Sequence, residues 1–312
     1  MITTENLGKS FPLGGWFRRR QLHAVRDVSI TVARGETLGL VGESGSGKST
    51  VGRLMLGLMP ATTGRVIFEG QDLATTSAGQ MRRMRRRLQL VFQDPYASLD
   101  PRRTIGAQIA DALVIHNLMD KPARTERVAD LLVQVGLTAE HAARYPHQFS
   151  GGQRQRIGIA RALAAGPDFL VADEPVSALD VSVQAQVLAL LASLRAQLGL
   201  AMLFISHDLP VVRHLCDRVA VMYLGRIMEE GPVREVFANP IHPYTKALLS
   251  AAPRLHPDRR RTRILLQGDP PSPADPPSGC VFRTRCAIAS PACAATIPRL
   301  AGTLHRVACL KA

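Results

Sequence analysis

Residues 37–49 read Thr-Leu-Gly-Leu-Val-Gly-Glu-Ser-Gly-Ser-Gly-Lys-Ser, an apolar run that enters a glycine-rich loop. The loop, from Gly42 to Ser49, matches the pattern G-x-x-x-x-G-K-[ST] in full. We expect a buried strand at 37–41 and a helix at 49–58, because this pattern joins a strand to a helix N-terminus. The glycines let backbone N–H groups turn inward around phosphate oxygens. The segment therefore predicts a phosphate-binding loop in an α/β fold.

Individual residues of this loop have separate predicted roles. Lys48 can reach the β- and γ-phosphates of a nucleotide, and the Ser49 hydroxyl can ligate Mg²⁺. The other predicted nucleotide-binding positions in this segment are Gly42, Ser44, Gly45, Gly47 and Thr50. A flexible Gly/Ser-rich turn is the alternative interpretation, and the strand before the loop and the helix after it disfavour that alternative.

A second apolar run ends in two acidic residues. Residues 169–174 read Phe-Leu-Val-Ala-Asp-Glu. We expect Asp173 to hold Mg²⁺ through water and Glu174 to polarise the attacking water. Many strands end in acidic residues, so this pattern is informative because it follows a phosphate-binding loop.

The rest of the chain is organised as strands alternating with helices. Further strands are expected at 28–32, 88–92 and 201–205, and further helices at 105–115, 124–135 and 182–198. This order predicts an α/β fold with a mainly parallel core sheet and a helical insertion at about 94–148. After about residue 238, Pro and Gly become frequent. We therefore expect one α/β domain at 1–238 that contains the phosphate loop, and a C-terminal extension at 239–312.

The composition limits the classes of protein to consider. The 312 residues carry a formal net charge of +14, which suits a solubilising surface or attraction to anionic lipid, nucleotide or nucleic acid, and charge alone does not choose among them. Aromatic residues make up 4% of the chain and are not interleaved with the arginine run at 82–87, so we expect no nucleic-acid partner. No run of 18 apolar residues and no signal-peptide core is present. We expect a cytoplasmic chain without a membrane span.

Further motifs resemble those of the ABC ATPase family. Residues 149–156, Phe-Ser-Gly-Gly-Gln-Arg-Gln-Arg, resemble its signature motif, and Gln93 in Val-Phe-Gln-Asp-Pro resembles its Q-loop glutamine. Residues 177–180, Ser-Ala-Leu-Asp, resemble its D-loop, and His207 in Ile-Ser-His-Asp resembles its switch histidine. All stand in the family's order, so the resemblance covers about residues 1–238. It implies a P-loop NTPase fold with an antiparallel β subdomain.

The resemblance also implies a mechanism. Two such domains would pair head to tail, with ATP between the phosphate loop of one and the signature motif of the other. Ser150 and the amides of Gly151 and Gly152 would form a second anion site at a helix N-terminus. The remaining roles are implied for Gln93 (Mg²⁺ or attacking water), His207 (γ-phosphate), Asp180 (across the dimer) and Glu174 (base).

The family stacks an aromatic residue upstream of the phosphate loop on adenine. Phe11 is the match in this sequence. Trp16 and Phe17 are alternatives, because residues 12–22 look inserted relative to a minimal ABC domain.

Four cysteines lie near the C-terminus, Cys280, Cys286, Cys293 and Cys309. A cytoplasmic setting disfavours structural disulfides. Four thiolates can bind zinc or an iron–sulfur cluster. The tight C-x₂₋₄-C spacing of most zinc sites is absent, and unligated cysteines in a small subdomain remain a third interpretation.

Three segments give a closer resemblance. Residues 93–101, 239–245 and 279–282 resemble the ATP-binding subunits of oligopeptide, dipeptide and nickel importers, which are uptake systems fed by an external binding protein. In some members of that group the C-terminal cysteines are associated with a [4Fe–4S] cluster. The resemblance implies ATP hydrolysis that powers peptide uptake at the cytoplasmic face of the inner membrane. A nickel or other solute importer, or a soluble ABC ATPase outside transport, is the alternative.

The same resemblance implies partners. They are a second ABC ATPase subunit in a heterodimer, two transmembrane permease subunits and an extracytoplasmic solute-binding protein. Residues 93–101 and the helices up to about 148 would form the groove that receives a permease helix.

Overall fold

The computed structural model describes residues 1–14, 20–94, 96–252 and 264–312, so Trp16, Phe17 and Pro95 lie outside the described residues. The chain divides into two compact units. The first comprises Met1–Thr31, Thr37–Ala74 and Ser206–Ala312, and the second comprises Val32–Glu36 and Thr75–Ile205.

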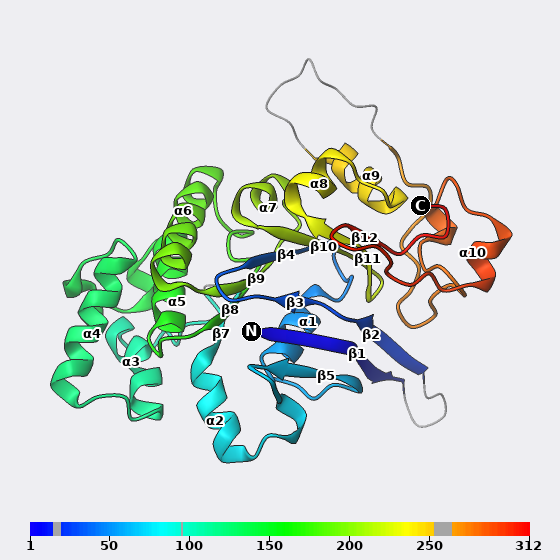
Figure 1. Ribbon diagram of the computed structural model, residues 1–312. Helices are drawn as coiled ribbons and strands as arrows, with labels where there is room; N and C mark the ends of the chain where they lie inside the picture. The colour runs from blue at the N-terminus through cyan, green and yellow to red at the C-terminus, as the bar shows by residue number, and fades with distance from the viewer. Residues whose placement is uncertain (15–19, 95, 253–263) are drawn as a thin grey trace. The chain divides into compact units, whose positions relative to one another are not determined.

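The first unit contains an antiparallel sheet with the strand order β2-β1-β5-β6 (Figure 1). Its strands are β1 (Ile2–Leu13), β2 (Arg20–Val28), β5 (Thr63–Phe68) and β6 (Gln71–Asp72). This is the antiparallel β subdomain that the family resemblance predicts. The single strand expected at 28–32 is wrong. Asp27 has a left-handed φ of 57°, β2 ends at Val28, and β3 (Thr31–Val32) is a separate short strand.

A second group of strands in the first unit carries the phosphate-loop segment. β4 (Thr37–Val41) is parallel to β10 (Arg218–Tyr223), which is antiparallel to β11 (Arg226–Pro232). The C-terminal β12 (Arg306–Val307) pairs antiparallel with β11. The predicted strand at 37–41 is confirmed, and every residue of it is buried.

The helices of the first unit are short. They are α1 (Lys48–Met55), α7 (Leu209–Leu215), α8 (Val233–Ala238), α9 (Pro243–Ala251), η5 (Arg283–Arg285) and α10 (Pro291–Ala295). The short η1 (Leu73–Thr75) ends one residue beyond the Thr37–Ala74 segment of this unit. The helix expected at 49–58 ends early, because the chain turns at Gly57 with a left-handed φ of 62°.

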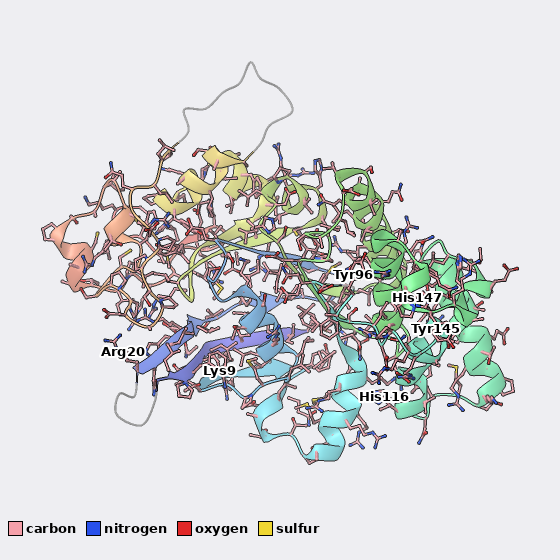
Figure 2. The ribbon with its side chains drawn as sticks, turned by 180° about the vertical axis from the view of Figure 1, so that it is seen from behind. Lys9, Arg20, Tyr96, His116, Tyr145 and His147 are labelled. Atoms are coloured by element: carbon pink, nitrogen blue, oxygen red, sulfur yellow. The ribbon has the colours of Figure 1, made fainter. Side chains whose placement is uncertain are left out.

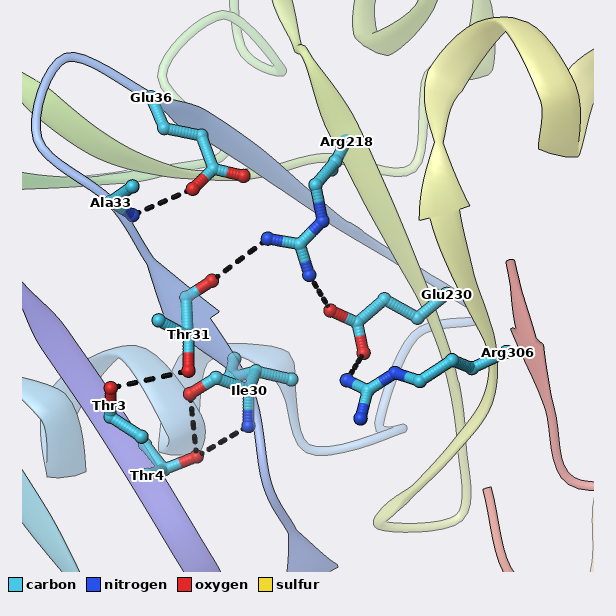
Figure 3. A network of polar contacts seen from close by, with 9 residues as sticks. All are labelled: Thr3, Thr4, Ile30, Thr31, Ala33, Glu36, Arg218, Glu230 and Arg306. Carbon is cyan, nitrogen blue, oxygen red and sulfur yellow. Dashed lines mark hydrogen bonds and ion pairs between the residues drawn. The ribbon is translucent and has the colours of Figure 1, made fainter. Parts of the chain in front are cut away.

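A polar network within this unit connects the C-terminal strand β12 to β11 and β10 (Figure 3). The Glu230 carboxylate, 1% exposed, accepts hydrogen bonds from Arg218 on β10 and Arg306 on β12. Arg218 also donates to the carbonyl of Thr31 at 3.2 Å. One buried carboxylate on β11 therefore joins the strands on either side of it.

The second unit has a fully parallel set of strands. β7 (Leu88–Val91) pairs with β8 (Phe169–Asp173), which pairs with β9 (Ala201–Ile205). β8 and β9 are buried along their whole length, as parallel strands covered on both faces are. Its helical segments are α2 (Ala78–Arg87), α3 (Ile105–Ile115), α4 (Lys121–Gln134), η2 (Ala139–Ala143), η3 (Pro146–Gln148), α5 (Gly151–Leu163) and α6 (Val181–Leu198). The mainly parallel core and the helical insertion are both confirmed.

Among the described residues, α6 is the one helix long and apolar enough to cross a membrane by length and composition alone. A core helix of a soluble protein passes the same test. Val187, Leu191 and Leu194 form a buried face of α6, and Arg195 donates to the carbonyl of Gly35 within the second unit. The expectation that the chain has no membrane span stays a prediction.

Candidate nucleotide-binding site

Two positions of the phosphate loop accept only glycine, because the backbone of neighbouring strands lies against them. Gly42 and Gly47 have left-handed φ values of 152° and 105°. A Cβ on Gly42 would lie 2.1 Å from the carbonyl oxygen of Met222, and one on Gly47 would lie 2.1 Å from that of Ala24. Strands β10 and β2 therefore leave no room for a side chain. Gly45, with φ of 76°, faces open space instead, on the exposed rim of the loop.

Lys48 lies under this loop at the start of α1. It is 5% exposed, and its ammonium donates to the carbonyls of Gly42 at 2.8 Å and Glu43 at 3.0 Å. Ser49 and Thr50 follow in the first turn of α1, half-buried, and Ser44 is exposed on the loop. A buried cation and a helix N-terminus meet in one loop, which is an arrangement that attracts a phosphate.

Two further residues of this loop, Ser46 and Glu43, have notable polar groups. The buried Ser46 hydroxyl has no hydrogen-bond partner among the described residues. Glu43 contacts two residues of the C-terminal extension, since its amide donates to the Tyr244 hydroxyl and its carboxylate accepts from Arg285. Sequence reasoning missed these contacts, because no local pattern links residues about 200 or more positions apart.

Phe11, the predicted adenine partner, lies on β1 opposite Leu22 of β2. Its ring is half-buried, and the Lys9 ammonium lies 5.3 Å from the ring centroid. Strand β2 also supplies the Ala24 carbonyl that presses on Gly47. The β1–β2 hairpin thus adjoins the phosphate loop, and the stacking role of Phe11 stays a prediction.

His207 is exposed in the turn before α7. The buried Ser206 hydroxyl accepts from the amide of Asp208 at 2.9 Å, and the Asp208 carboxylate caps α7 by accepting from the amide of Val211. The turn is therefore fixed on both sides of His207.

In the second unit, Asp173 and Glu174 stand at the end of β8, as predicted. Asp173 is 6% exposed, and the Glu174 amide donates to the carbonyl of Ile205 at 3.0 Å. Glu174 has a left-handed φ of 45°, a strained conformation for a residue that is not glycine and one that recurs at functional sites. The Gln93 amide donates to the Glu174 carboxylate at 3.2 Å. Two predicted site residues that are 81 positions apart are thus brought together.

The signature segment begins helix α5. Ser150 is its N-cap: its hydroxyl accepts from the amide of Gln153 at 3.4 Å, and the Gln153 side chain accepts from the amide of Ser150 at 3.0 Å. A Cβ on Gly152 would lie 2.3 Å from Val183 on α6, whereas Gly151 has a looser contact of 3.4 Å. The sequence pattern predicted the helix N-terminus but not this close approach of α6.

Asp180 is exposed at the N-cap of α6, and its side chain makes no capping hydrogen bond. Hydrogen bonds fix the segment 177–180 at both of its ends. Ser177 donates to the carbonyl of Glu174 at 3.1 Å, and Gln184 donates to the carbonyls of Val176 and Leu179. The D-loop is therefore an ordered connection between Glu174 and α6.

Four cysteines of the extension, Cys280, Cys286, Cys293 and Cys309, line one small cavity of about 20 Å³. Burial raises the pKa of the Cys280 and Cys286 thiols, whereas hydrogen bonds from Ser290 lower the pKa of Cys293. Among the described residues, no group of three or more His, Cys, Asp or Glu side chains is arranged to hold a metal ion. The packing thus gathers the thiols without forming a ligand set, and the [4Fe–4S] assignment is not supported.

Aromatic side chains are exposed on the second unit. Phe92 is 48% and Tyr96 62% exposed. The Arg154 guanidinium lies 3.9 Å from the Tyr96 ring centroid and donates to the carbonyl of Pro146, which stands between Tyr145 and His147 (Figure 2). Tyr96, Tyr145 and His147 lie in the segments predicted to receive a permease helix, and Phe92 and Arg154 flank those segments in the sequence.

Two family models match the chain. The one described as "ABC transporter" matches residues 25–177, and the one described as "Oligopeptide/dipeptide transporter, C-terminal region" matches residues 228–293. The first match includes the phosphate loop, the signature segment and the acidic end of β8, and the second includes most of the C-terminal extension.

The chain also matches curated relatives over most of their length. The chain is 51% identical to the oligopeptide transport ATP-binding protein AppF of Bacillus subtilis, covering 99% of this chain and 96% of the relative. It is 53% identical to the oligopeptide transport ATP-binding protein OppF of Salmonella typhimurium, covering 95% and 90%. A protein of Brucella ovis named for peptide import ATP-binding is 59% identical, with 91% and 89% covered.

Solved structures show the same fold. The dimeric ATP-binding cassette MJ0796 bound to ADP and Pi is similar with a TM-score of 0.67 at 29% identity, covering 75% of this chain and 99% of that one. CbiO1 of Clostridium perfringens, part of an ABC transporter complex, gives 0.66 at 27% identity, covering 76% and 90%. With these likenesses and the site geometry, the chain belongs to the ATP-hydrolysing ATP-binding proteins of ABC transporters, in the group that carries the oligopeptide/dipeptide C-terminal region.

Proposed function

We propose that this chain binds and hydrolyses ATP to power peptide uptake by a binding-protein-dependent importer. One observation carries the proposal: this chain matches both an ABC transporter model and an oligopeptide/dipeptide C-terminal model. Three relatives that it matches over at least 89% of their length are named for peptide or oligopeptide transport. The observed phosphate loop and the Gln93–Glu174 pair support turnover rather than simple nucleotide storage.

The phosphate loop holds the triphosphate in this proposal. Lys48 moves its ammonium from loop carbonyls to the β- and γ-phosphates, and the amides of α1 face the same oxygens. Ser49 and Asp173 supply hydroxyl and carboxylate oxygens, the ligand type that Mg²⁺ prefers. When bound, the ion neutralises charge on the phosphates.

Glu174 acts as the base toward the attacking water. Its left-handed backbone turns the side chain away from the direction that β8 gives Asp173, so adjacent carboxylates serve different roles. Gln93 orients the Glu174 carboxylate through its side-chain amide. This contact can transmit the nucleotide state to the exposed rings of Phe92 and Tyr96, which flank Gln93 in the sequence.

A second subunit completes the site. Ser150 and the amides of Gly151 and Gly152 at the start of α5 form an anion site for the γ-phosphate held by the partner ATPase. His207 contacts the γ-phosphate, and Asp180 reaches across the dimer. The partner is a different ATPase subunit, so the active form is a heterodimer.

The membrane partners follow from the family. Two permease subunits and an extracytoplasmic binding protein complete the importer, which places this chain at the cytoplasmic face of the inner membrane. The exposed Phe92 and Tyr96 suit a permease helix, because aromatic side chains are enriched at protein–protein interfaces. A nickel or other solute importer of the same group is the second candidate, and stimulation of ATP hydrolysis by peptide-loaded rather than nickel-loaded binding protein distinguishes the two.

The four cysteines remain a candidate site for a [4Fe–4S] cluster because all four line one cavity. A cavity this small holds about one water molecule, so cluster binding requires the thiols to move apart. Iron and sulfide analysis after anaerobic purification tests this, and an iron-free protein excludes the cluster.

Glu174→Gln tests the catalytic assignment. We expect the variant to bind ATP and to lose turnover by about a hundredfold or more, because a neutral amide cannot accept the proton of the attacking water. ATP hydrolysis by the assembled importer and ATP binding by the chain are the measurements. Glu235→Gln, on the exposed surface of α8, is the matched control and should hydrolyse ATP normally. Normal turnover by Glu174→Gln would contradict the assignment.

A further inference from the structure

Glu43 is an unusual residue of the phosphate loop, since its backbone and its side chain are both held by distant parts of the first unit. Its amide donates to the Tyr244 hydroxyl at 2.9 Å, and its carbonyl accepts from the Lys48 ammonium at 3.0 Å. One nitrogen of Arg285 donates to both carboxylate oxygens, at 2.8 and 3.0 Å. The loop that carries the phosphate-binding lysine is therefore attached to α9 and to η5 of the extension.

Arg285 lies in a largely buried environment beside packed aromatic rings. Its side chain is 9% exposed, and the nitrogen that contacts Glu43 also donates to the Tyr223 hydroxyl at 3.4 Å. The rings of Tyr223, Tyr244 and Phe282 pack together with centroids 4.7 to 5.3 Å apart. Burial lowers the pKa of Arg285, and the hydrogen bonds to Glu43 and Tyr223 raise it by more, so the guanidinium stays charged.

The charge of Glu43 requires such a partner. A carboxylate in a loop that binds a triphosphate repels its ligand, and the repulsion is strong where the pair is shielded from water. Arg285 neutralises this carboxylate, and the Glu43 side chain itself is only 27% exposed. The ion pair is thus more than a surface contact of negligible energy.

We propose that Arg285 is a positioning residue for ATP: it neutralises and orients Glu43, so the C-terminal extension sets the affinity of the phosphate loop. The inference depends on ATP binding by this chain and not on the transported solute. A failure of peptide import would therefore leave it standing.

Titration of the full-length chain with ATP tests the proposal, together with KM and kcat of the assembled importer. Arg285→Gln should weaken ATP binding and raise KM about threefold to tenfold with kcat within about twofold, because an uncompensated carboxylate then faces the nucleotide. Adding Glu43→Gln removes that carboxylate and should return Kd and KM to within about twofold of the unaltered chain. Thermal unfolding of each variant establishes that it is folded.

Arg283→Gln is the matched control, because Arg283 lies in the same turn η5 and its side chain donates to Ser278, away from Glu43. Its Kd for ATP should not change. Two results would overturn the proposal: an Arg285→Gln affinity equal to that of the control, or a loss that Glu43→Gln fails to recover. The second would show that Arg285 only braces the fold.

Discussion

Single atoms decide which positions of the site accept only glycine. Gly152 and Gly158 both lie in α5, six residues apart, and the sequence does not distinguish them as structural positions. A Cβ on Gly152 would meet Val183 at 2.3 Å, whereas one on Gly158 would meet no atom within 4 Å. The first glycine therefore permits a close contact between helices, and the second only weakens its helix.

The two glycines should respond in opposite directions to alanine. Gly152→Ala should lower the free energy of unfolding by about 1–3 kcal/mol, because the half-buried, β-branched side chain of Val183 has few rotamers that would avoid the new methyl group. Gly158→Ala should raise it by about 0.5–1 kcal/mol through helix propensity. Urea unfolding measures both. Val183→Ala, added to Gly152→Ala, should relieve the clash, and two equal effects of the alanine substitutions would contradict this account.

At the scale of elements, helix α9 depends on a buried histidine for its start. The Nδ1 atom of His242 accepts from the amide of Tyr244 at 3.1 Å, and the His242 amide donates to the buried Glu229 carboxylate at 3.0 Å. Burial, aided by the charge of Lys246, lowers the pKa of His242 to about 4. The cap therefore works with a neutral imidazole.

This capping predicts a pH dependence. Between pH 6.5 and about 4 the unfolded chain binds a proton at His242 and the folded chain does not, so stability is complete above pH 6.5 and falls as the pH decreases. The slope reaches about 1.4 kcal/mol per pH unit. His242→Asn keeps a good N-cap residue, and the variant should lose the part of the pH dependence of unfolding free energy that comes from His242. Urea unfolding at pH 5 and 7 compares the two chains, and an unchanged pH difference in the variant would refute the assignment.

At the scale of the whole molecule, the C-terminal extension belongs to the same compact unit as the phosphate loop. Strand β12 pairs with β11, where the almost fully buried acids Glu229 and Glu230 meet His305 and Arg306. The composition predicts a boundary between two domains at residue 238, and this boundary stays a prediction. The folded unit includes residues on both sides of that position.

Truncation of the C-terminus tests how much β12 stabilises the first unit. A chain ending at Leu304 lacks β12, His305 and Arg306, and should unfold with a free energy lower by about 3 kcal/mol, because two buried carboxylates each lose a partner. A chain ending at Ala308 keeps β12 and serves as the control. Calorimetry of both should show a lower Tm only for the shorter chain. Equal melting temperatures would mean that β12 does not stabilise the unit.

Local patterns were enough to predict much of this protein. The strand at 37–41, the phosphate loop, the acidic end of β8 and the start of α5 each depend on neighbours within about ten residues, because glycine conformations, apolar periodicity and helix caps are local properties. The order of these motifs, through resemblance, also gave the ABC ATPase fold. The strand expected at 28–32 was wrong because the chain leaves the strand conformation at Ser29 and Ile30, which hydrogen-bond to Asn6 and Thr4 more than twenty positions away, and a local pattern does not specify such partners.

Only the tertiary structure decided the contacts between distant segments. The Gln93–Glu174 hydrogen bond, the approach of Val183 to Gly152 and the Arg285–Glu43 ion pair join residues from 31 to 242 positions apart. No sequence pattern specifies such pairs, since each depends on how strands and helices pack after they form. The sequence by itself thus determined that this protein has an ATP-binding loop, and the packing of the chain determined that the C-terminal extension holds it.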